Sequence, residues 1–248
     1  MLNIIESTEE VALYAGDLSD DIRLIRNLSH ALEIVGGFSK PHKMPCHCYN
    51  LPASRCKMGG KLNTVQGSVC YGCYAADDMD WVKRKNAANG KWVLTRYTMH
   101  TVQRALSRRF DSLNNPLWVP AMIYAINHYA RKGSDHFRWH DSGDLQDRNH
   151  FLNIIVVCEN TPSVKHWLPT REYAVVRGVS IPENLCVRLS AHMLNANPPD
   201  FGMPTSTVST GDPIAGVRCN APSNEGKCGS CRLCWDRNVQ NIDYHHHN

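Results

Sequence analysis

The stretch His136-Phe-Arg-Trp-His140, followed directly by Asp141-Ser-Gly-Asp144, decides how the fold is interpreted. Its first five residues are typical of a short strand, and residues 146–159 have the apolar character and length of a helix. Residues 164–168 then predict a second strand. A strand, a helix and another strand in this order are typical of a parallel pair joined by a crossover helix.

The same alternation continues on both sides of this unit. Upstream, Asn115-Pro116 predicts the start of a helix that ends at Gly133. Downstream, a short helix ending near Gly178, a strand over 185–189 and a strand over 205–209 extend the pattern. We therefore expect an α/β fold, either an open parallel sheet or an incomplete (β/α) barrel.

Polar residues lie directly after each expected strand, at its carboxyl end. In parallel α/β folds this edge carries the active site, so we expect a pocket there. The candidates for catalytic roles are His140, Asp141, Asp144, Arg171, Glu172 and Arg188. The candidates for holding a cofactor are Ser142 and Ser190, and His192, Thr210 and Asp212 share the same position. Asp141 and Asp144 could instead cap the helix that follows them.

Two helical segments are expected before this region. Over residues 16–36 apolar side chains recur at every third or fourth position, which predicts one amphipathic helix. Residues 77–110 are helical in character, with an interruption at Asn89-Gly90. Their basic residues include Lys83, Arg84, Lys85, Lys91, Arg96, Arg104, Arg108 and Arg109. A solvated helix face explains this charge, and nucleic-acid binding is the alternative.

Composition narrows the classes of protein that fit. The chain has 248 residues, of which 42% are hydrophobic and 20% charged, and this excludes intrinsic disorder. No apolar run approaches the roughly 20 residues of a membrane helix, and the first residues do not resemble a secretory signal. The net charge of +4 permits nucleic-acid binding without requiring it. We expect a single domain over 1–248, with a helix and cysteine loops in 1–76, an α/β core in 77–212 and a cysteine motif in 213–248.

The 11 cysteines are the most unusual feature of the composition. Without a secretory signal we expect a cytoplasmic location, where disulfides are rare. Their odd number also argues against a complete set of disulfides. Metal binding, catalysis or burial must then account for the thiols, and their spacing distinguishes among these.

Four cysteines near the end of the chain have the spacing of a metal site. They lie in Cys219-Asn-Ala-Pro-Ser-Asn-Glu-Gly-Lys-Cys228-Gly-Ser-Cys231-Arg-Leu-Cys234. Two successive Cys-x-x-Cys steps let one turn aim three sulfurs at one point, as iron–sulfur clusters and tetrahedral zinc require. Cys219 is the natural fourth ligand.

A second group of possible ligands lies upstream and consists of Cys56, Cys70 and Cys73. Gly59, Gly60 and Gly67 let the chain fold back so that Cys56 can join the Cys70–Cys73 pair. Three cysteines suit a [4Fe-4S] cluster with one uncovered iron, whereas zinc would need a further ligand such as His47. The sequence leaves the metal open.

The remaining cysteines divide into two pairs. Cys158 and Cys186 lie inside apolar runs and are expected to be small buried core residues. Cys46 and Cys48, in Pro45-Cys-His-Cys48, are either additional ligands or residues with a packing role, and packing is the favoured interpretation.

Several of these segments together resemble the phage gene product 88 family. They are Lys43-Met44-Pro45, Leu51-Pro52-Ala53, Gly60-Lys61-Leu62, Gly67-Ser68-Val69-Cys70, Cys73-Tyr74-Ala75, Arg138 to Asp144, and Cys228-x-x-Cys-x-x-Cys234-Trp235-Asp236. The element Gly-x-x-Cys-x-x-Cys-Tyr-Ala is also similar to phage proteins grouped with the radical S-adenosylmethionine enzymes, which are partial barrels with a cluster at the strand ends. The resemblance implies a metal, a core of that kind and, for a phage protein, the host cytoplasm.

Three hypotheses about function remain open. In the first, Cys56, Cys70 and Cys73 hold a [4Fe-4S] cluster that binds S-adenosylmethionine, and the C-terminal cysteines hold a second cluster or a structural zinc. In the second, the two groups of cysteines close one all-cysteine cluster with a redox, sensing or structural role. In the third, zinc stabilises a nucleic-acid binder that uses the basic residues from Lys83 to Arg109. The substrate is not predicted.

Overall fold

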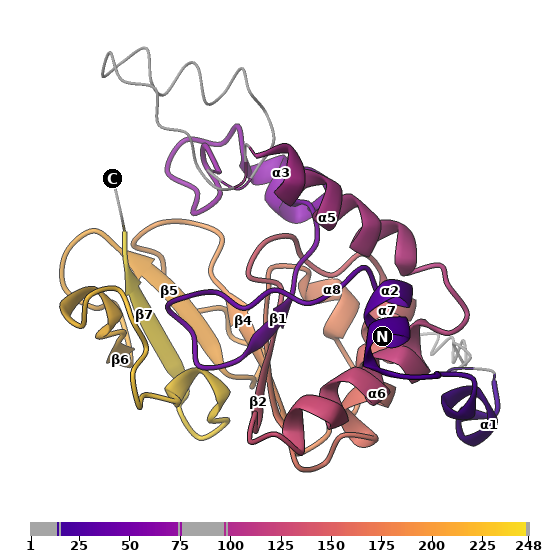
Figure 1. Cartoon of the computed structure of the whole chain (residues 1–248). Helices are drawn as coiled ribbons and strands as arrows, with labels where there is room; N and C mark the ends of the chain where they lie inside the picture. Colours follow the sequence, from indigo (N-terminus) through magenta and orange to yellow (C-terminus); the bar gives the residue numbers. More distant parts are fainter. Residues whose placement is uncertain (1–13, 15, 74, 76–96, 98, 247–248) are drawn as a thin grey trace, which may run out of the picture.

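The chain forms one open sheet of seven strands, all of them parallel to their neighbours. The structure is a computed structural model and describes residues 14, 16–73, 75, 97 and 99–246. The strands are β1 His47–Tyr49, β2 His136–Trp139, β3 Lys165–Thr170, β4 Leu185–Ser190, β5 Thr205–Ser209, β6 Val217–Arg218 and β7 Asn241–His245. Their spatial order is β1-β2-β3-β4-β5-β7-β6, so the first five follow the chain order across the sheet (Figure 1).

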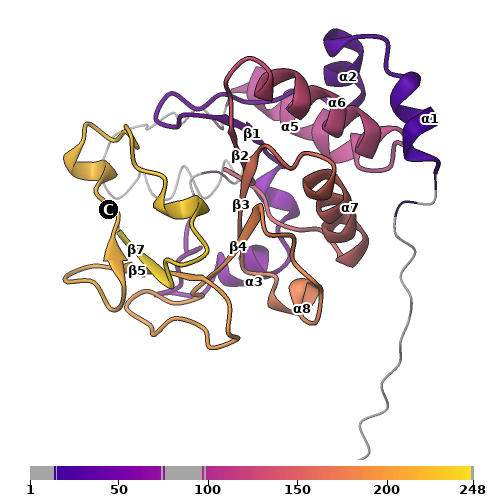
Figure 2. The ribbon, with the colours of Figure 1, turned by 90° about the horizontal axis from the view of Figure 1, so that it is seen from below.

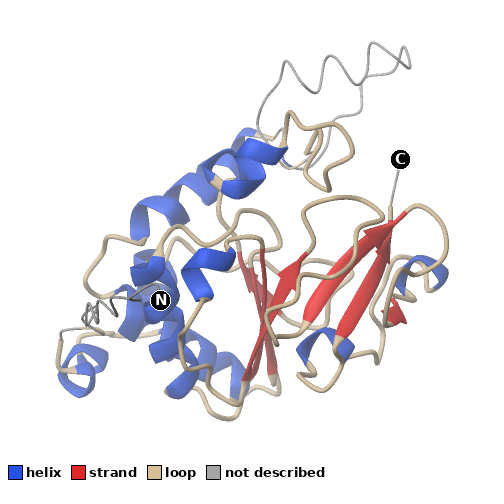
Figure 3. Ribbon diagram, turned by 180° about the vertical axis from the view of Figure 1, so that it is seen from behind, coloured by secondary structure: helices blue, strands red, loops and turns tan. Residues whose placement is uncertain are grey.

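Helices cover one side of β1 to β4, as Figures 2 and 3 show. They are α1 Leu18–Arg23, α2 Leu28–Ile34, α5 His100–Ser112, α6 Trp118–Ala130, α7 Arg148–Glu159 and α8 Tyr173–Val176. The short helix α3 Met58–Leu62 lies at the carboxyl ends of the strands instead. The C-terminal segment from β6 to β7 lies on the other side of these strands. No helix in the described part of the chain is both long and apolar enough to cross a membrane.

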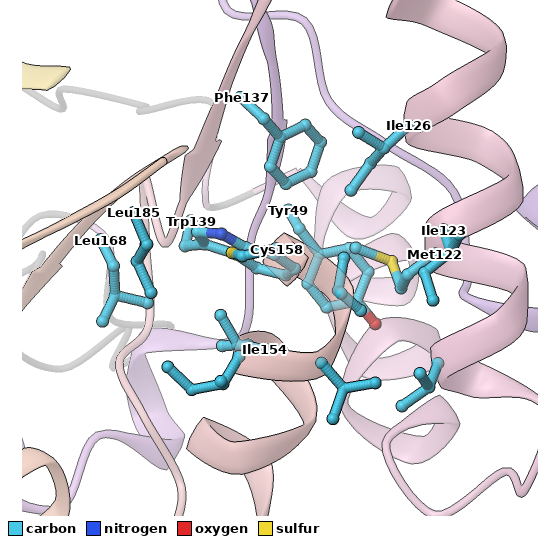
Figure 4. Close-up of a cluster of buried hydrophobic side chains, with 14 of the residues drawn as sticks. Tyr49, Met122, Ile123, Ile126, Phe137, Trp139, Ile154, Cys158, Leu168 and Leu185 are labelled. Atoms are coloured by element: carbon cyan, nitrogen blue, oxygen red, sulfur yellow. The ribbon is translucent and has the colours of Figure 1, made fainter. Parts of the chain in front are cut away.

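The helix-covered side holds the main apolar core. Because side chains alternate along a strand, β2 turns Phe137 and Trp139 toward the helices while Arg138 faces the opposite side. Around these rings pack residues of α6 and α7, including Met122 and Cys158 (Figure 4). The expectation that Cys158 is a core thiol is thus confirmed, and Cys186 on β4 is also fully buried.

The expected α/β fold is confirmed, and four of its strands lie where the sequence placed them. The strand over residues 205–209 matches β5 in its bounds, and β2, β3 and β4 differ from their expected bounds by one or two residues at an end. The helix expected from Asn115-Pro116 is α6, which begins at Trp118. Most of the helical segment expected over 77–110 lies outside the described residues, and α5 is its described continuation.

Three expectations about helices are wrong. Residues 16–36 form two short helices rather than one, because Asn27 leaves the helical conformation and its side chain caps α2 by accepting from the amide of His30. Neither Asp141 nor Asp144 caps α7, since Asp147 takes that position. Arg109 is not on a solvated helix face either, because it is buried and donates to Gly37 O (2.8 Å).

Candidate functional site

Residues 56–73, here called the upstream thiol loop, lie against the carboxyl ends of the central strands. The amide of Met58 donates to Glu172 Oε1 just after β3 (2.6 Å). After β4, the amide of Val69 donates to His192 O (2.9 Å), and the amide of Leu194 donates to Gly67 O (2.9 Å). The loop that carries Cys56, Cys70 and Cys73 is therefore held at the edge where parallel α/β folds place their sites.

The interior of the upstream thiol loop positions its cysteines. Asn63 Oδ1 accepts from the amide of Cys73 (3.0 Å), which fixes the end of the loop relative to α3. A Cβ added at Gly59 would lie 3.6 Å from the sulfurs of both Cys56 and Cys70. The two sulfurs thus approach a common point, and the absence of a side chain at Gly59 keeps that point open.

The three thiols lie close enough to influence one another electrostatically. Burial raises the pKa of Cys56 and of Cys70, and the charges of Cys73 and Asp144 raise both further. Arg171 acts in the opposite direction and lowers the pKa of both thiols. Within the described ranges, no group of three or more His, Cys, Asp or Glu side chains is arranged to hold a metal ion.

Asp144 is a buried carboxylate held from three directions. It accepts from Thr170 Oγ1 (2.6 Å) and from the amides of Leu145 (2.8 Å) and Arg171 (2.9 Å). Burial raises the pKa of Asp144 to about 6, although these hydrogen bonds oppose the shift. Asp144 therefore fixes the chain where β3 ends and places the start of the Arg171–Glu172 turn.

Arg171 supplies the positive charge that acts on the thiols of Cys56 and Cys70. The described residues contain no carboxylate paired with its guanidinium, and its buried Nε lacks an acceptor. A positive charge beside thiols favours their ionised, metal-binding form. Among the residues expected at the strand ends, the structure therefore brings Asp144, Arg171 and Glu172 to the cysteines.

Two serines expected to hold a cofactor are engaged with the chain itself. Ser142 Oγ donates to Leu51 O (3.0 Å), which connects the ends of β1 and β2. Ser190 Oγ accepts from Ser206 Oγ (3.0 Å) across β4 and β5. Both lie at the carboxyl edge of the sheet, and their contacts align neighbouring strands.

His140 and Arg188 are placed away from the upstream thiols, whereas Asp141 accepts from Tyr97 Oη (3.5 Å), and Cys73 packs against the cluster that contains Tyr97. His140 lies on the helix-covered side beside His150, with ring centroids 5.5 Å apart, and burial lowers the pKa of its imidazole. Asp141 pairs with Arg138 (2.8 Å). Arg188 is fully buried and donates to the carbonyls of Thr205, Leu233, Asp236 and Val239. The bonds to Leu233 and Asp236 hold the Arg188 side chain against the turn that carries Cys234.

Cys219, Cys228, Cys231 and Cys234, here called the C-terminal thiol group, lie on the opposite side of the sheet from α6 and α7. The amide of Cys231 donates to Cys228 O (3.0 Å) and closes the first Cys-x-x-Cys turn. The charges of Cys219 and Cys231 raise the pKa of Cys228 beyond the effect of burial. These thiols therefore lie near enough to influence one another, and their ligation of one metal stays a prediction.

Cys46 and Cys48 belong spatially to this second group. They form a buried cluster with Met44, Trp167 and Trp235, and Cys228 and Cys234 pack against it. The expectation of a packing role is consistent with this burial. The neighbours of the two cysteines also include other thiols, however. Their Cys-x-Cys spacing is the sequence pattern that also allows these two cysteines to be additional metal ligands.

The two groups of thiols have different neighbours. The cysteines of the upstream thiol loop are influenced by one another and by Asp144, Arg171 and Glu172. Those of the C-terminal thiol group are influenced by Arg138 and Arg188. Figures 1 and 2 show the loop around α3 and the C-terminal segment in separate parts of the molecule.

Fold and site together define an open parallel α/β protein with a cysteine loop across the carboxyl ends of its strands. The Gene product 88 family model matches residues 23–237. The chain therefore belongs to the Gene product 88 family, as the resemblance of its motifs indicated. No curated protein and no solved structure matches it.

Proposed function

We propose that this chain is an iron–sulfur protein of the radical S-adenosylmethionine type, with a [4Fe-4S] cluster held by Cys56, Cys70 and Cys73. The observation that carries the proposal is the position of these thiols, in a loop bonded to the segments that follow β3 and β4. Three thiolates leave one iron of such a cluster for S-adenosylmethionine. The bound cluster would supply an electron for reductive cleavage of that cofactor.

The residues around the upstream thiols suit such a group. Burial raises the pKa of Cys56 and of Cys70, and the charge of Arg171 partly offsets that rise and so favours the thiolates that bind iron. The open point beside Gly59, to which two sulfurs turn, supports ligation by those sulfurs. Asp144 and the Met58–Glu172 bond hold the strand end and the loop in fixed relation.

The strand order also supports this proposal. Strands β1 to β5 are parallel and adjacent in the order of the chain, as they would be in an incomplete (β/α) barrel. In that arrangement the carboxyl ends face a common site. Cofactor binding at this edge remains part of the proposal: Asp144, Arg171 and Glu172 act on the upstream thiols, and Ser142 and Ser190 lie at the same edge.

For the C-terminal thiol group we propose a second metal centre, either a second cluster or a structural zinc. The separate neighbours of the two groups favour two centres over the single shared cluster of the alternative hypothesis. The nucleic-acid hypothesis loses one residue of its basic set, because Arg109 is buried and donates to Gly37 O instead of facing a ligand.

The test is anaerobic purification of the full chain, with iron and acid-labile sulfide measured and paramagnetic spectra recorded with and without S-adenosylmethionine. We expect a cluster whose reduced signal shifts when the cofactor is added. Cys73→Ala should abolish that signal, and Cys186→Ala, which changes a buried thiol beside Arg188 and outside the upstream thiol loop, should retain it. A reduced signal that does not change when the cofactor is added, or a cofactor-sensitive signal that survives Cys73→Ala, would contradict the proposal.

A further inference from the structure

The segment before β1 crosses the side of the sheet that bears the C-terminal thiol group. We call residues 39–48 the strap. Its two ends are joined by two backbone hydrogen bonds, from the amide of Ser39 to Cys48 O (2.9 Å) and from the amide of Cys48 to Ser39 O (2.7 Å). In between, Lys43 O accepts from the amide of Cys228 (3.0 Å). Segments separated by most of the chain are thus joined at the backbone next to the cysteines.

The thiols of the strap face those of the C-terminal motif in a water-excluded cluster. Cys46 and Cys48 are 1% and 0% exposed, and Cys228 and Cys234 pack against the cluster that they form with Met44, Trp167 and Trp235. Hydrogen bonding to Cys46 and burial together raise the pKa of Cys48, and the charge of Cys46 raises the pKa of Cys228. Cysteines from two distant segments therefore meet in one cluster, in which no three thiols of the described residues are yet arranged to hold a metal ion.

Two donors beside this cluster lack acceptors. Nε1 of Trp167 and Nε of Arg138 are buried and have no hydrogen-bond partner among the described residues. The Arg138 guanidinium lies over the Trp167 ring at 4.4 Å, and its charge lowers the pKa of Cys228 and Cys234. Buried N–H groups require acceptors, and metal-bound thiolates are acceptors that also benefit from a nearby cation.

We propose that Cys46 and Cys48, together with Cys228 and Cys234, supply the four thiolate ligands of the metal centre at the C-terminal thiol group, so that the strap and the C-terminal motif are joined by one thiolate-bound metal. This inference rests on the part of the proposed function that assigns a metal to the C-terminal motif. Each ligand binds as a thiolate and releases its proton to solvent. The ligand chemistry is that of a soft cation, zinc or the iron of a cluster.

The test uses the full chain with Cys56, Cys70 and Cys73 all changed to Ser, so that only metal outside the upstream thiol loop is counted. In this background we add Cys46→Ser and Cys48→Ser together, and in a parallel protein Cys186→Ser. Cys186 is as buried as Cys48 and is contacted by Arg188 rather than by another thiol, which makes it a matched control. Bound zinc and iron are then measured after loading with each metal separately.

We expect the background and the Cys186→Ser protein to bind metal, and the Cys46→Ser/Cys48→Ser protein to lose it. The metal that binds the background distinguishes zinc from iron. Stoichiometric metal in the double variant would overturn the inference, and so would equal loss in the Cys186→Ser control. A background protein without any metal would also overturn it, while the cluster proposed for the upstream thiol loop would stand on its own iron measurement.

Because serine in a buried site can disturb folding, Co²⁺ binding supplies a second readout. The intensity of the sulfur-to-cobalt charge-transfer band reports the number of thiolate ligands. We expect each single change, Cys46→Ser or Cys48→Ser, to weaken this band relative to Cys186→Ser. Far-ultraviolet circular dichroism of the metal-free proteins should be the same for all variants. An unchanged band in both single variants would contradict ligation by the strap.

Discussion

The two groups of thiols differ in what surrounds them. The cysteines of both groups are half-buried. The upstream thiol loop has carboxylates and an arginine beside it, after β3. The C-terminal thiol group packs instead against a buried cluster of aromatic rings and two fully buried cysteines of the strap. Charged neighbours suit chemistry on a bound molecule, whereas a buried apolar cluster suits stabilisation of the fold.

This comparison predicts that the C-terminal centre contributes far more stability than the upstream one. We expect Cys228→Ser together with Cys234→Ser to lower the free energy of unfolding of the metal-loaded protein by more than about 4 kcal/mol, because the metal joins the strap to the sheet. Cys56→Ser, Cys70→Ser and Cys73→Ser together should cost much less. Urea unfolding under anaerobic conditions measures both. Equal losses would break the comparison.

The next largest effect is expected at Arg138, whose ion pair lies between β2 and the enclosed thiols. Arg138→Met removes the ion pair with Asp141 Oδ1 (2.8 Å), in a site where both side chains are at most 15% exposed. We expect a loss of about 3 kcal/mol in the free energy of unfolding. The control is Arg23→Met, since the Arg23–Asp20 pair is about 70–80% exposed and should change stability by less than about 1 kcal/mol.

The upstream thiol loop should be insensitive to Arg138→Met. Its thiols are influenced by Arg171 instead, so the iron bound by Cys56, Cys70 and Cys73 is expected to stay the same. Loss of that iron in Arg138→Met, with the fold intact by circular dichroism, would show that the two groups depend on each other.

The helix-covered side supplies a pH dependence that involves neither group of thiols. Burial lowers the pKa of His166 to about 3, so the folded protein holds this imidazole neutral, with Nε2 2.8 Å from Thr161 Oγ1. As the pH falls below the usual value of about 6.5, the unfolded chain takes up the proton first, and stability decreases down to a pH of about 3. Between pH 7 and pH 5 the loss from this residue is about 2 kcal/mol.

His166→Gln tests this contribution, because glutamine does not titrate. We expect the difference in unfolding free energy between pH 7 and pH 5 to be smaller in the variant by about 2 kcal/mol. His150, whose pKa burial lowers to about 4, should still contribute in both proteins. An unchanged pH dependence in His166→Gln would mean that His166 is not the neutral, buried group described above.

The alternating core of the fold could be predicted from the sequence, and its edges could not. Strands β2 to β5 are flanked by helices or turn residues and have buried side chains. Their apolar sequence pattern and the turn residues at their ends therefore identify them. Strand β7 has buried polar residues instead. Its Asp243 accepts from Thr207 Oγ1 and Ser209 Oγ (both 2.7 Å), and these partners lie far away in the sequence. A strand stabilised in this way has no local apolar pattern.

The site could be predicted in part for a related reason. Position after a strand places Asp144, Arg171 and Glu172 at the correct edge, but it does not tell on which side of the sheet a side chain lies. His140 adopts a left-handed conformation (φ 55°) and turns to the helices, and Arg188 points to the C-terminal turn. The meeting of Cys46 and Cys48 with Cys228 depends on the path of the strap, which no local pattern encodes.

The smallest effect is expected at Gly59, and it sharpens the comparison at the upstream thiol loop. A Cβ there would lie 3.1 Å from the Cβ of Cys56 and 3.6 Å from two sulfurs, whereas a Cβ at Gly60 meets nothing within 4 Å. Both glycines lie in α3, where alanine is favoured over glycine by about 1 kcal/mol. We expect Gly60→Ala to raise stability by up to that amount and to retain its iron.

Gly59→Ala should gain less stability and hold less iron than Gly60→Ala, because its methyl group fills the point to which the sulfurs of Cys56 and Cys70 turn. Iron per chain after anaerobic reconstitution measures this difference, and thermal unfolding of the metal-free proteins measures the helical gain. Zinc or iron at the C-terminal thiol group should be the same in both variants. If both retained equal upstream iron, the open point beside Gly59 would have no part in binding it, and the sulfurs would reach the metal from another direction.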